Sequence, residues 1–252
     1  MTYYSKIAGL SLGVVTAFGS IAPAQAYSLS FGEDLNFLGT GNDRPVLTET
    51  PNASAAAASF LSNFDNVHTA TFEDLDLGTT GSVSLDFEGA ATATLSGAGE
   101  VSDWVQNGVR PISGDQYWLT YARDNGFRID FDKAVAGFGF YANDIGDVGA
   151  TVQLELGLAN GGTTIIDLPH QTTAGQSGSV LYQGILAENE DELFSSIRFI
   201  ATGGGNDGFG FDNMTVGSFN QLKETAETPE PGLMLGFALM GAFGLRSQLK
   251  RK

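Results

Sequence analysis

Cysteine is absent from all 252 residues, and basic residues are scarce. Without cysteine there is no disulfide, so the fold must rest on a packed core, on bound metal, or on both. Between residues 27 and 228 the chain carries 28 Asp and Glu against 7 Lys and Arg, a net charge of −21. Such a surface repels nucleic-acid phosphates, which argues against a nucleic-acid partner, but it is compatible with divalent cations and with neutral polysaccharide.

Linear catalytic motifs are also lacking. The two histidines, His68 and His170, form no His-x-x-x-His pair of metal ligands, and residues 27–228 contain no Gly-x-Ser-x-Gly nucleophile elbow. Paired carboxylates of the kind glycosidases use can arise from almost any two of so many acids, so they discriminate little. These absences favour a non-catalytic binding or scaffolding protein. A polysaccharide-acting hydrolase without a linear motif is the alternative.

The N-terminus has the pattern of an export signal. Lys6 gives the start a weak positive charge, and the run from Ile7 to Ile21 is apolar or small. Ala24 and Ala26, on either side of Gln25, match the small-x-small cleavage pattern. Residues 1–26 are therefore predicted to be a secretory signal peptide.

The C-terminus combines three chemically distinct parts. Pro229-Glu230-Pro231 comes first, and the fourteen apolar or small residues from Gly232 to Leu245 follow. Arg246, Lys250, Arg251 and Lys252 then make the end basic. The apolar run is shorter than the roughly 20 residues that a membrane-spanning helix needs, but it lengthens if it continues to Leu249 with Arg246 snorkelling. A basic end on the cytoplasmic side follows the charge bias of membrane topology.

This order of parts over residues 229–252 closely resembles the PEP-CTERM sorting signal of exported Gram-negative surface proteins. The resemblance implies recognition by an exosortase, a membrane transpeptidase, with cleavage at or near Pro229, Glu230 and Pro231. It also implies a precursor held transiently in the membrane and a mature protein at the cell surface or outside the cell. The resemblance concerns the destination of the protein and carries no activity.

The intervening stretch has the length of one domain. Residues 27–66 are predicted to be a lead-in with one short helix, in which Thr50 caps and Pro51 takes the first helical position. From residue 67 the hydrophobic period becomes two, and Gly, Asn and Asp separate the runs. After an alternating stretch at 67–74, the predicted strands are Ser82–Phe87, Ala90–Leu95, Tyr117–Tyr121, Phe127–Phe131, Val135–Tyr141, Thr151–Leu156, Thr163–Leu168, Ser179–Leu186, Leu193–Ala201 and Phe209–Val216.

So many short strands predict an all-β, two-sheet antiparallel sandwich of the jelly-roll type over residues 67–218, followed by a linker at 219–228. Within it the tetrapeptide Gly-Phe-Gly-Phe occurs twice, at 137–140 and 208–211. Because alternate residues of a strand face opposite sides, the rings are predicted to fill the core while the glycines let a neighbour approach.

Three phrases between residues 131 and 217 carry a second resemblance: FDKAVAGFGFYANDIGD, SGSVLYQGIL and DGFGFDNMTVG. They are similar to the landmarks of a β-sandwich domain found in many exported PEP-CTERM proteins, whose layout is similar to that of calcium-bearing carbohydrate-binding jelly rolls. In such modules a structural calcium joins an acid on an early strand to one on the last strand. The resemblance places those two acids at Glu73 and Asp212.

Calcium also fits the acids themselves, since Ca²⁺ takes carboxylate and carbonyl oxygens. Oxygen ligands cluster at residues 71–76, at 143–147 and at 206–213, so the candidate ligands are Glu73, Asp144, Asp147, Asp207 and Asp212. Ordinary turn acids that cap loops through Asx-turn bonds are the alternative interpretation.

Aromatic residues offer a candidate glycan surface, because flat rings stack on sugar rings. Trp104, Tyr117, Trp118 and Tyr121 gather between residues 103 and 125 and include both tryptophans of the chain. In a strand, Tyr117 and Trp118 point to opposite faces, so one of the two is predicted to face outward. Core packing of each ring is the alternative.

Overall fold

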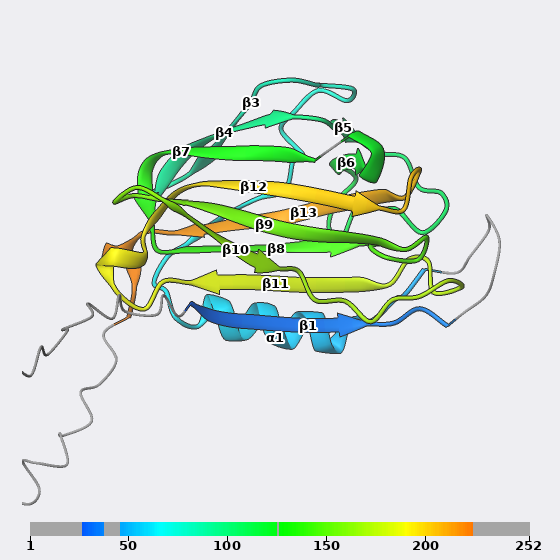
Figure 1. The fold of residues 1–252 in the computed structure, drawn as a ribbon, viewed down its shortest axis with the longest axis horizontal. Helices are drawn as coiled ribbons and strands as arrows, with labels where there is room; N and C mark the ends of the chain where they lie inside the picture. Colours follow the sequence, from blue (N-terminus) through cyan, green and yellow to red (C-terminus); the bar gives the residue numbers. More distant parts are fainter. Residues whose placement is uncertain (1–26, 38–45, 125, 224–252) are drawn as a thin grey trace, which may run out of the picture.

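The computed structural model describes residues 27–37, 46–124 and 126–223. They form two antiparallel β-sheets packed face to face, with one α-helix against the outer face of the first sheet (Figure 1). This confirms the predicted all-β sandwich with one short helix near its N-terminal end.

The first sheet has seven strands in the order β1-β11-β8-β13-β6-β5, with β2 paired to β13 beside that path. Its strands are β1 (Ser28–Asp34), β2 (His68–Ala70), β5 (Glu100–Ser102), β6 (Tyr117–Tyr121), β8 (Gly137–Asn143), β11 (Val180–Leu186) and β13 (Gly208–Gly217). The second sheet has six strands in the order β10-β9-β12-β7-β4-β3. They are β3 (Val83–Phe87), β4 (Ala91–Gly97), β7 (Phe127–Val135), β9 (Ala150–Leu158), β10 (Thr163–Asp167) and β12 (Phe194–Gly203). The helices are α1 (Pro51–Leu61) and three short 3-10 turns, η1 (Ala122–Asp124), η2 (Glu190–Glu192) and η3 (Phe219–Gln221).

The space between the sheets is filled largely by phenylalanine. Phe127 of β7 and Phe199 of β12 stack with ring centroids 4.2 Å apart, and Phe211 of β13 meets Phe127 edge-on at 5.1 Å. Phe138 and Phe140 of β8 come from the first Gly-Phe-Gly-Phe tetrapeptide, and all the rings of both tetrapeptides are at most 1% exposed. The predicted core role of these rings is confirmed.

The glycines on the opposite face of the first sheet receive the helix. Phe60 of α1 lies over β8 and β11, where a Cβ added at Gly184 would stand 2.6 Å from its ring. The same ring would crowd a Cβ at Gly139. Glycine is therefore required here because the helix lies close to the sheet, which confirms the second half of the prediction.

The N-terminus of α1 is capped from another strand. The two carboxylate oxygens of Asp34, the last residue of β1, accept the backbone N–H groups of Asn52 at 3.2 Å and Ala53 at 2.9 Å. Thr50 precedes the helix as predicted, but its side chain makes no capping bond to the described residues. The predicted Thr50 cap is wrong because the buried Asp34 carboxylate already satisfies the N–H groups and suits the positive end of the helix.

Two boundaries of the predicted domain are also wrong. The lead-in at 27–66 contains β1, an edge strand that pairs with β11 from Ser28 opposite Leu186 to Asp34 opposite Val180. At the other end, the linker predicted at 219–228 begins with η3, and the N–H of Lys223 donates to the carbonyl of Asn63 at 2.9 Å. The sandwich therefore extends to both sides of the predicted range 67–218.

The predicted signal peptide at 1–26 and the predicted sorting signal at 229–252 lie outside the described residues. Among the residues that the structure does describe, no helix has the length and apolar character needed to cross a membrane.

Gly184→Ala should destabilise the fold by about 1–3 kcal/mol, because the new methyl group would clash with the ring of Phe60. Gly184 is not among the residues with positive φ, so the effect is steric. Urea unfolding measures the loss, which corresponds to a drop in Tm of roughly 2–4 °C per kcal/mol. Adding Phe60→Leu to Gly184→Ala should restore part of the lost stability, because the smaller side chain leaves room for the methyl group. If the loss of stability in the double variant equals the sum of the losses in the two single variants, the two residues are not in contact.

Candidate functional site

Two connections between the sheets meet at one end of the sandwich. In the first sheet, Asn143 at the end of β8 pairs with Gly210 near the start of β13. In the second sheet, Ala150 at the start of β9 pairs with Gly203 at the end of β12. The β8–β9 connection and the β12–β13 connection therefore cross from sheet to sheet side by side.

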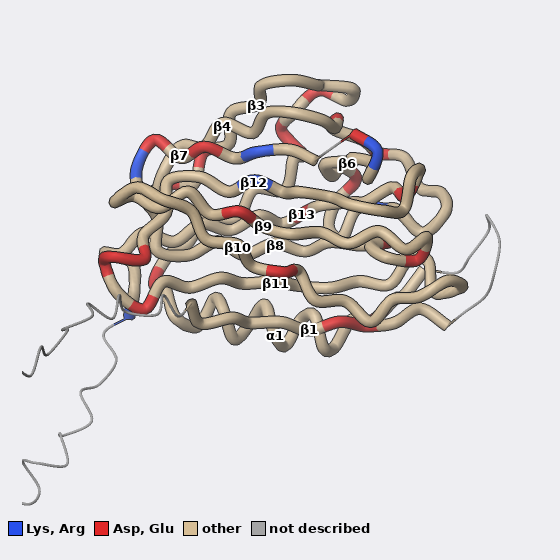
Figure 2. The backbone as a smooth tube through the Cα atoms, in the orientation of Figure 1, with Lys and Arg blue, Asp and Glu red and all other residues tan. Residues whose placement is uncertain are grey.

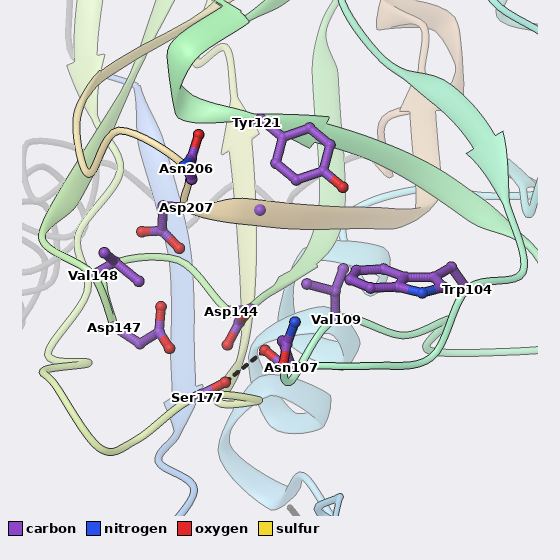
Figure 3. A pocket seen from close by; sticks show the side chains of 11 residues that line it. Trp104, Asn107, Val109, Tyr121, Asp144, Asp147, Val148, Ser177, Asn206 and Asp207 are labelled. Carbon is purple, nitrogen blue, oxygen red and sulfur yellow. Dashed lines mark hydrogen bonds between the residues drawn. The ribbon is translucent and has the colours of Figure 1, made fainter. Parts of the chain in front are cut away.

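Three acids come together where these connections meet. Asp144 and Asp147 lie on the β8–β9 connection, and Asp207 lies on the β12–β13 connection. One carboxylate oxygen of each lies within 4.8 Å of those of the other two. Figure 3 shows the carboxylates of Asp147 and Asp207 turned toward each other, with Asp144 beside them.

Asp144 is held in place by the segment that leads into β11. The N–H of Gly178 donates to its Oδ1 at 2.6 Å, and its own N–H donates to the carbonyl of Ser179 at 3.0 Å. These bonds follow from the register, because Val180 of β11 pairs with Asn143 of β8. Asp144 itself has a φ of 66°, a left-handed conformation that Asp and Asn tolerate better than most residues.

Asp207 is buried without such support. Its side chain is 1% exposed, and neither carboxylate oxygen makes a hydrogen bond to the described residues. The N–H groups of Gly146 and Ala150 lie near enough to favour its charged form, but not in hydrogen-bonding geometry. A buried polar group without a partner is costly, so this carboxylate calls for a proton, a cation or a ligand.

Burial and mutual repulsion both disfavour charge on these acids. Burial, and then the neighbouring Asp147, raise the pKa of Asp144 to about 8. Burial, and then the same neighbour, raise the pKa of Asp207 to about 7. The site therefore binds protons near neutral pH unless a cation takes their place.

The acids form the floor of a cavity of about 280 Å³. Its walls come from the β5–β6 loop, the end of β6, the β8–β9 connection, the segment before β11, and the β12–β13 connection with the first residue of β13. The wall residues are Trp104, Asn107, Val109, Tyr121, Val148, Ser177, Asn206 and Gly208 (Figure 3). The Ser177 hydroxyl donates to the carbonyl of Asn107 at 2.7 Å and so ties two of these walls together.

Trp104 and Tyr121 are the two predicted glycan-binding rings that reach the pocket. Trp104 is 37% exposed, and its carbonyl accepts a hydrogen bond from the Tyr117 hydroxyl at 2.6 Å. The guanidinium of Arg123 lies over one face of the Tyr121 ring, 4.4 Å from its centroid, and also donates to Asn206 Oδ1. Trp104 is therefore better placed than Tyr121 to stack on a sugar.

The prediction that Tyr117 or Trp118 faces outward is wrong, since both are fully buried. Trp118 packs between the sheets near Phe72 and Phe127. Tyr117 points to the other face of β6, where Val109 and Leu119 pack with it. The outer face of β6 is covered by the loop that precedes it, so neither ring is available to stack on a sugar.

The predicted calcium pair Glu73 and Asp212 lies elsewhere, under the loop that carries the pocket wall. Asp212 Oδ2 accepts the N–H groups of Ile112 at 2.8 Å and Ser113 at 3.0 Å, and Glu73 Oε1 accepts those of Asp115 and Gln116 at 3.0 and 2.8 Å. Both carboxylates anchor the β5–β6 loop in this way. Calcium between them stays a prediction.

Of the five candidate metal ligands, the structure brings together Asp144, Asp147 and Asp207. Asn107, Val109, Val148 and Ser177 were not predicted from the sequence. The one signal for them was the SGSVLYQGIL phrase, which begins at Ser177. The others follow only from how the loops are placed.

No protein-family model matches the sequence, and no curated protein sequence matches it. Solved structures match with TM-scores below 0.4. The xylan-binding CBM22-1 domain of Paenibacillus barcinonensis Xyn10C is 16% identical, with a TM-score of 0.38 over 65% of this chain and 99% of that one. The C-terminal family 22 carbohydrate-binding module of Clostridium thermocellum Xyn10B is 12% identical, with a TM-score of 0.35 over 65% and 98%. The K2 cleaved adhesin domain of Lys-gingipain is 13% identical, with a TM-score of 0.34 over 60% and 97%.

Stability without metal should fall as the pH rises from 5 to 8. In the native state Asp144 keeps its proton up to about pH 8 and Asp207 up to about pH 7, but both are ionised when unfolded, where the pKa of Asp is about 3.9. The native state thus binds more protons, and each such group lowers stability by up to about 1.4 kcal/mol per pH unit until its native pKa is reached. Urea unfolding in chelator measures the slope.

Asp207→Asn should reduce that pH dependence, since it removes one of the buried titrating groups. Glu190→Gln removes an exposed acid in η2, at the opposite end of β12, and should leave the slope unchanged. A stability that is constant or rises between pH 5 and 8 in chelator would contradict the buried protons.

Proposed function

We propose that the chain is an exported, C-terminally processed protein of the cell surface or extracellular matrix that binds polysaccharide without catalysis. The observation that carries this proposal is the pocket itself. A partly exposed indole, Trp104, stands beside carboxylate and amide groups in a concave site of about 280 Å³. Ligand sites are typically concave, with apolar walls and a few convergent polar groups.

The chemistry of the walls suits a sugar. One side offers the apolar surfaces of Trp104 and Val109, against which the C–H face of a pyranose can pack (Figure 3). The other offers the acids and the amides of Asn107 and Asn206, which accept and donate hydrogen bonds to hydroxyl groups. A net charge of −21 between residues 27 and 228 favours a neutral polysaccharide over an acidic one.

The size of the pocket limits the ligand. A cavity of about 280 Å³ lies at the lower end of the roughly 300–1,000 Å³ typical of small-molecule sites. It suits one sugar unit, either at a chain end or in a side branch, better than an extended run of the polymer. The remainder of the chain would then lie over the surface beside Trp104.

Export and processing are supported by the sequence. The predicted signal peptide at 1–26 and the sorting motif Pro229, Glu230 and Pro231 bracket the sandwich. An exosortase and, transiently, the membrane are the partners that this pattern implies. The arrangement would deliver the sandwich to the polysaccharide layer in which its ligand lies.

The hydrolase alternative is supported by one feature of the site, the raised pKa of Asp144 beside Asp147. Glycosidases place two carboxyl groups about 5–5.5 Å apart or about 6.5–9.5 Å apart, on either side of the sugar bond. Here carboxylate oxygens lie within 4.8 Å, and Asp144 and Asp207 are at most 3% exposed. Such acids suit shared binding of a proton or cation better than attack on a substrate.

Trp104→Ala should weaken binding to the cognate polysaccharide at least tenfold, since the loss of a stacking ring costs more than about 1.4 kcal/mol at a hot spot. A glycan array with the purified protein identifies the ligand, and calorimetry measures the affinity. Trp104→Phe should keep part of the binding because it keeps a ring.

Ile165→Ala is the control, because Ile165 is also an exposed apolar residue but lies on β10, at the edge of the other sheet. It should bind like the natural chain. Equal binding by Trp104→Ala would contradict the pocket as the glycan site, and release of reducing sugar from the bound polysaccharide would favour the hydrolase.

The mature protein should lack Leu233 to Lys252, because cleavage at or near Pro229-Glu230-Pro231 removes the apolar run and the basic end. Intact-mass analysis of protein released from the cell surface measures this directly. A mass that still includes the C-terminal lysines would rule out processing by an exosortase.

A further inference from the structure

We propose that Asp144, Asp147 and Asp207 bind a single Ca²⁺ at the floor of the pocket. The site is distinct from the Glu73–Asp212 pair and independent of whether a glycan binds. It joins the β8–β9 connection to the β12–β13 connection, both of which cross from one sheet to the other.

The spacing of the three carboxylates matches one Ca²⁺. Oxygens that share a calcium at ~2.3–2.6 Å lie no more than about 4.6–5.2 Å apart. The ligand oxygens here all lie within 4.8 Å of one another. Mg²⁺ demands near-ideal octahedral geometry, keeps several waters and is usually bound through one or two carboxylates, so a site with three carboxylates favours calcium.

Asp207 supplies the independent observation that a ligand belongs here. Five carboxylates among the described residues are buried: Asp34, Asp144, Glu192, Asp207 and Asp212. Four of them accept at least one backbone N–H, from Ala53, Gly178, Glu188 and Ile112 respectively. Asp207 accepts none from the described residues, although it is 1% exposed and its carboxylate faces Asp147 (Figure 3).

The local charge points the same way. The acid-rich connections bring three carboxylates together, and the nearby Arg123 lies over the Tyr121 ring and donates to Asn206. A divalent cation would offset both the repulsion among the acids and the cost of burying them. Asp212 accepts the backbone N–H groups of Ile112 and Ser113, whereas Asp207 accepts none from the described residues.

Three carboxylates leave part of a calcium shell open. Ca²⁺ takes six to eight oxygens, and three carboxylates supply between three and six. The remaining positions would face the cavity, where water or the oxygens of a bound molecule can fill them. The same cavity is walled by Trp104, so the cation would lie next to any ligand in the pocket.

The test is calorimetric titration of CaCl₂ into the purified protein after removal of metal, with no sugar present. We expect one Ca²⁺ per chain, and a rise in Tm of several degrees in calcium relative to chelator at matched ionic strength. Asp207→Asn should weaken the affinity at least tenfold and abolish the rise in Tm. Its Tm in chelator should match or exceed that of the natural chain, because it removes a buried charge, and this shows that the variant folds.

Two control variants separate this site from the alternatives. Glu190→Gln removes one exposed acid far from the pocket, and Glu73→Gln removes one member of the other predicted calcium pair. Both should bind Ca²⁺ like the natural chain. Absence of binding heat, or loss of binding in Glu73→Gln with binding kept in Asp207→Asn, would overturn the proposal.

Terbium locates the ion. Tb³⁺ replaces Ca²⁺ at oxygen sites and emits when a nearby indole is excited, so the emission should fall in Trp104→Phe while the affinity for Ca²⁺ stays the same. Emission unaffected by Trp104→Phe and by Asp207→Asn would place the ion elsewhere. Because no glycan enters these measurements, failure of the proposed function and failure of the metal site give different results.

Discussion

The structure depends on one constraint: carboxylates are buried in a chain that has few Lys and Arg side chains to pair with them. The sandwich buries five acids, and backbone N–H groups donate to four of them. Two of these bonded acids also position other elements: Asp34 caps α1 from the end of β1, and Asp212, together with the exposed Glu73, anchors the β5–β6 loop. Figure 2 shows how few basic residues are available in the sandwich. Hydrogen bonds from backbone N–H groups to a carboxylate are strong, and the donor is not a long, mobile side chain. They can therefore fix loops where surface salt bridges would contribute little.

The second constraint is the close approach of α1 to the first sheet, which places β1 and so Asp34. Phe60 rests where Gly139 and Gly184 leave the sheet without side chains, and the ring of Tyr182 lies beside it, with centroids 6.1 Å apart. On the other face of the same strands, Phe138 and Phe140 of β8 and Leu181 and Ile185 of β11 fill the inter-sheet core. One alternating pattern therefore serves both faces of a strand: large rings inward, and no side chain where the helix lies.

Most strands of the sandwich were predictable because their hydrophobic period is local. β1 was missed because an edge strand with one half-buried face shows no clean alternation, and β5 was missed because three residues are too few to show a period. The site was predictable only in part. Asp144 and Asp147 are neighbours in sequence, but Asp207 joins them through the pairing of β8 with β13, which no linear pattern specifies. The prediction that one of Tyr117 and Trp118 faces outward failed because alternation indicates which face of a strand a ring takes, and not whether a loop, here the one carrying Val109, covers that face.

Asp207, the buried acid without a hydrogen bond to the described residues, bears on the stability of the fold. A carboxylate buried without a partner lowers the stability of the fold, and proteins keep such groups mainly where a ligand uses them. Asp207 is such a group in the described part of the chain, and it faces the pocket in which Trp104 is the available ring. The surrounding acid excess draws cations toward the same place, because a cleft lined by one sign of charge concentrates the opposite sign. The other four buried acids each accept a backbone N–H, so among the described residues Asp207 is the buried carboxylate left to be neutralised by a proton or a cation.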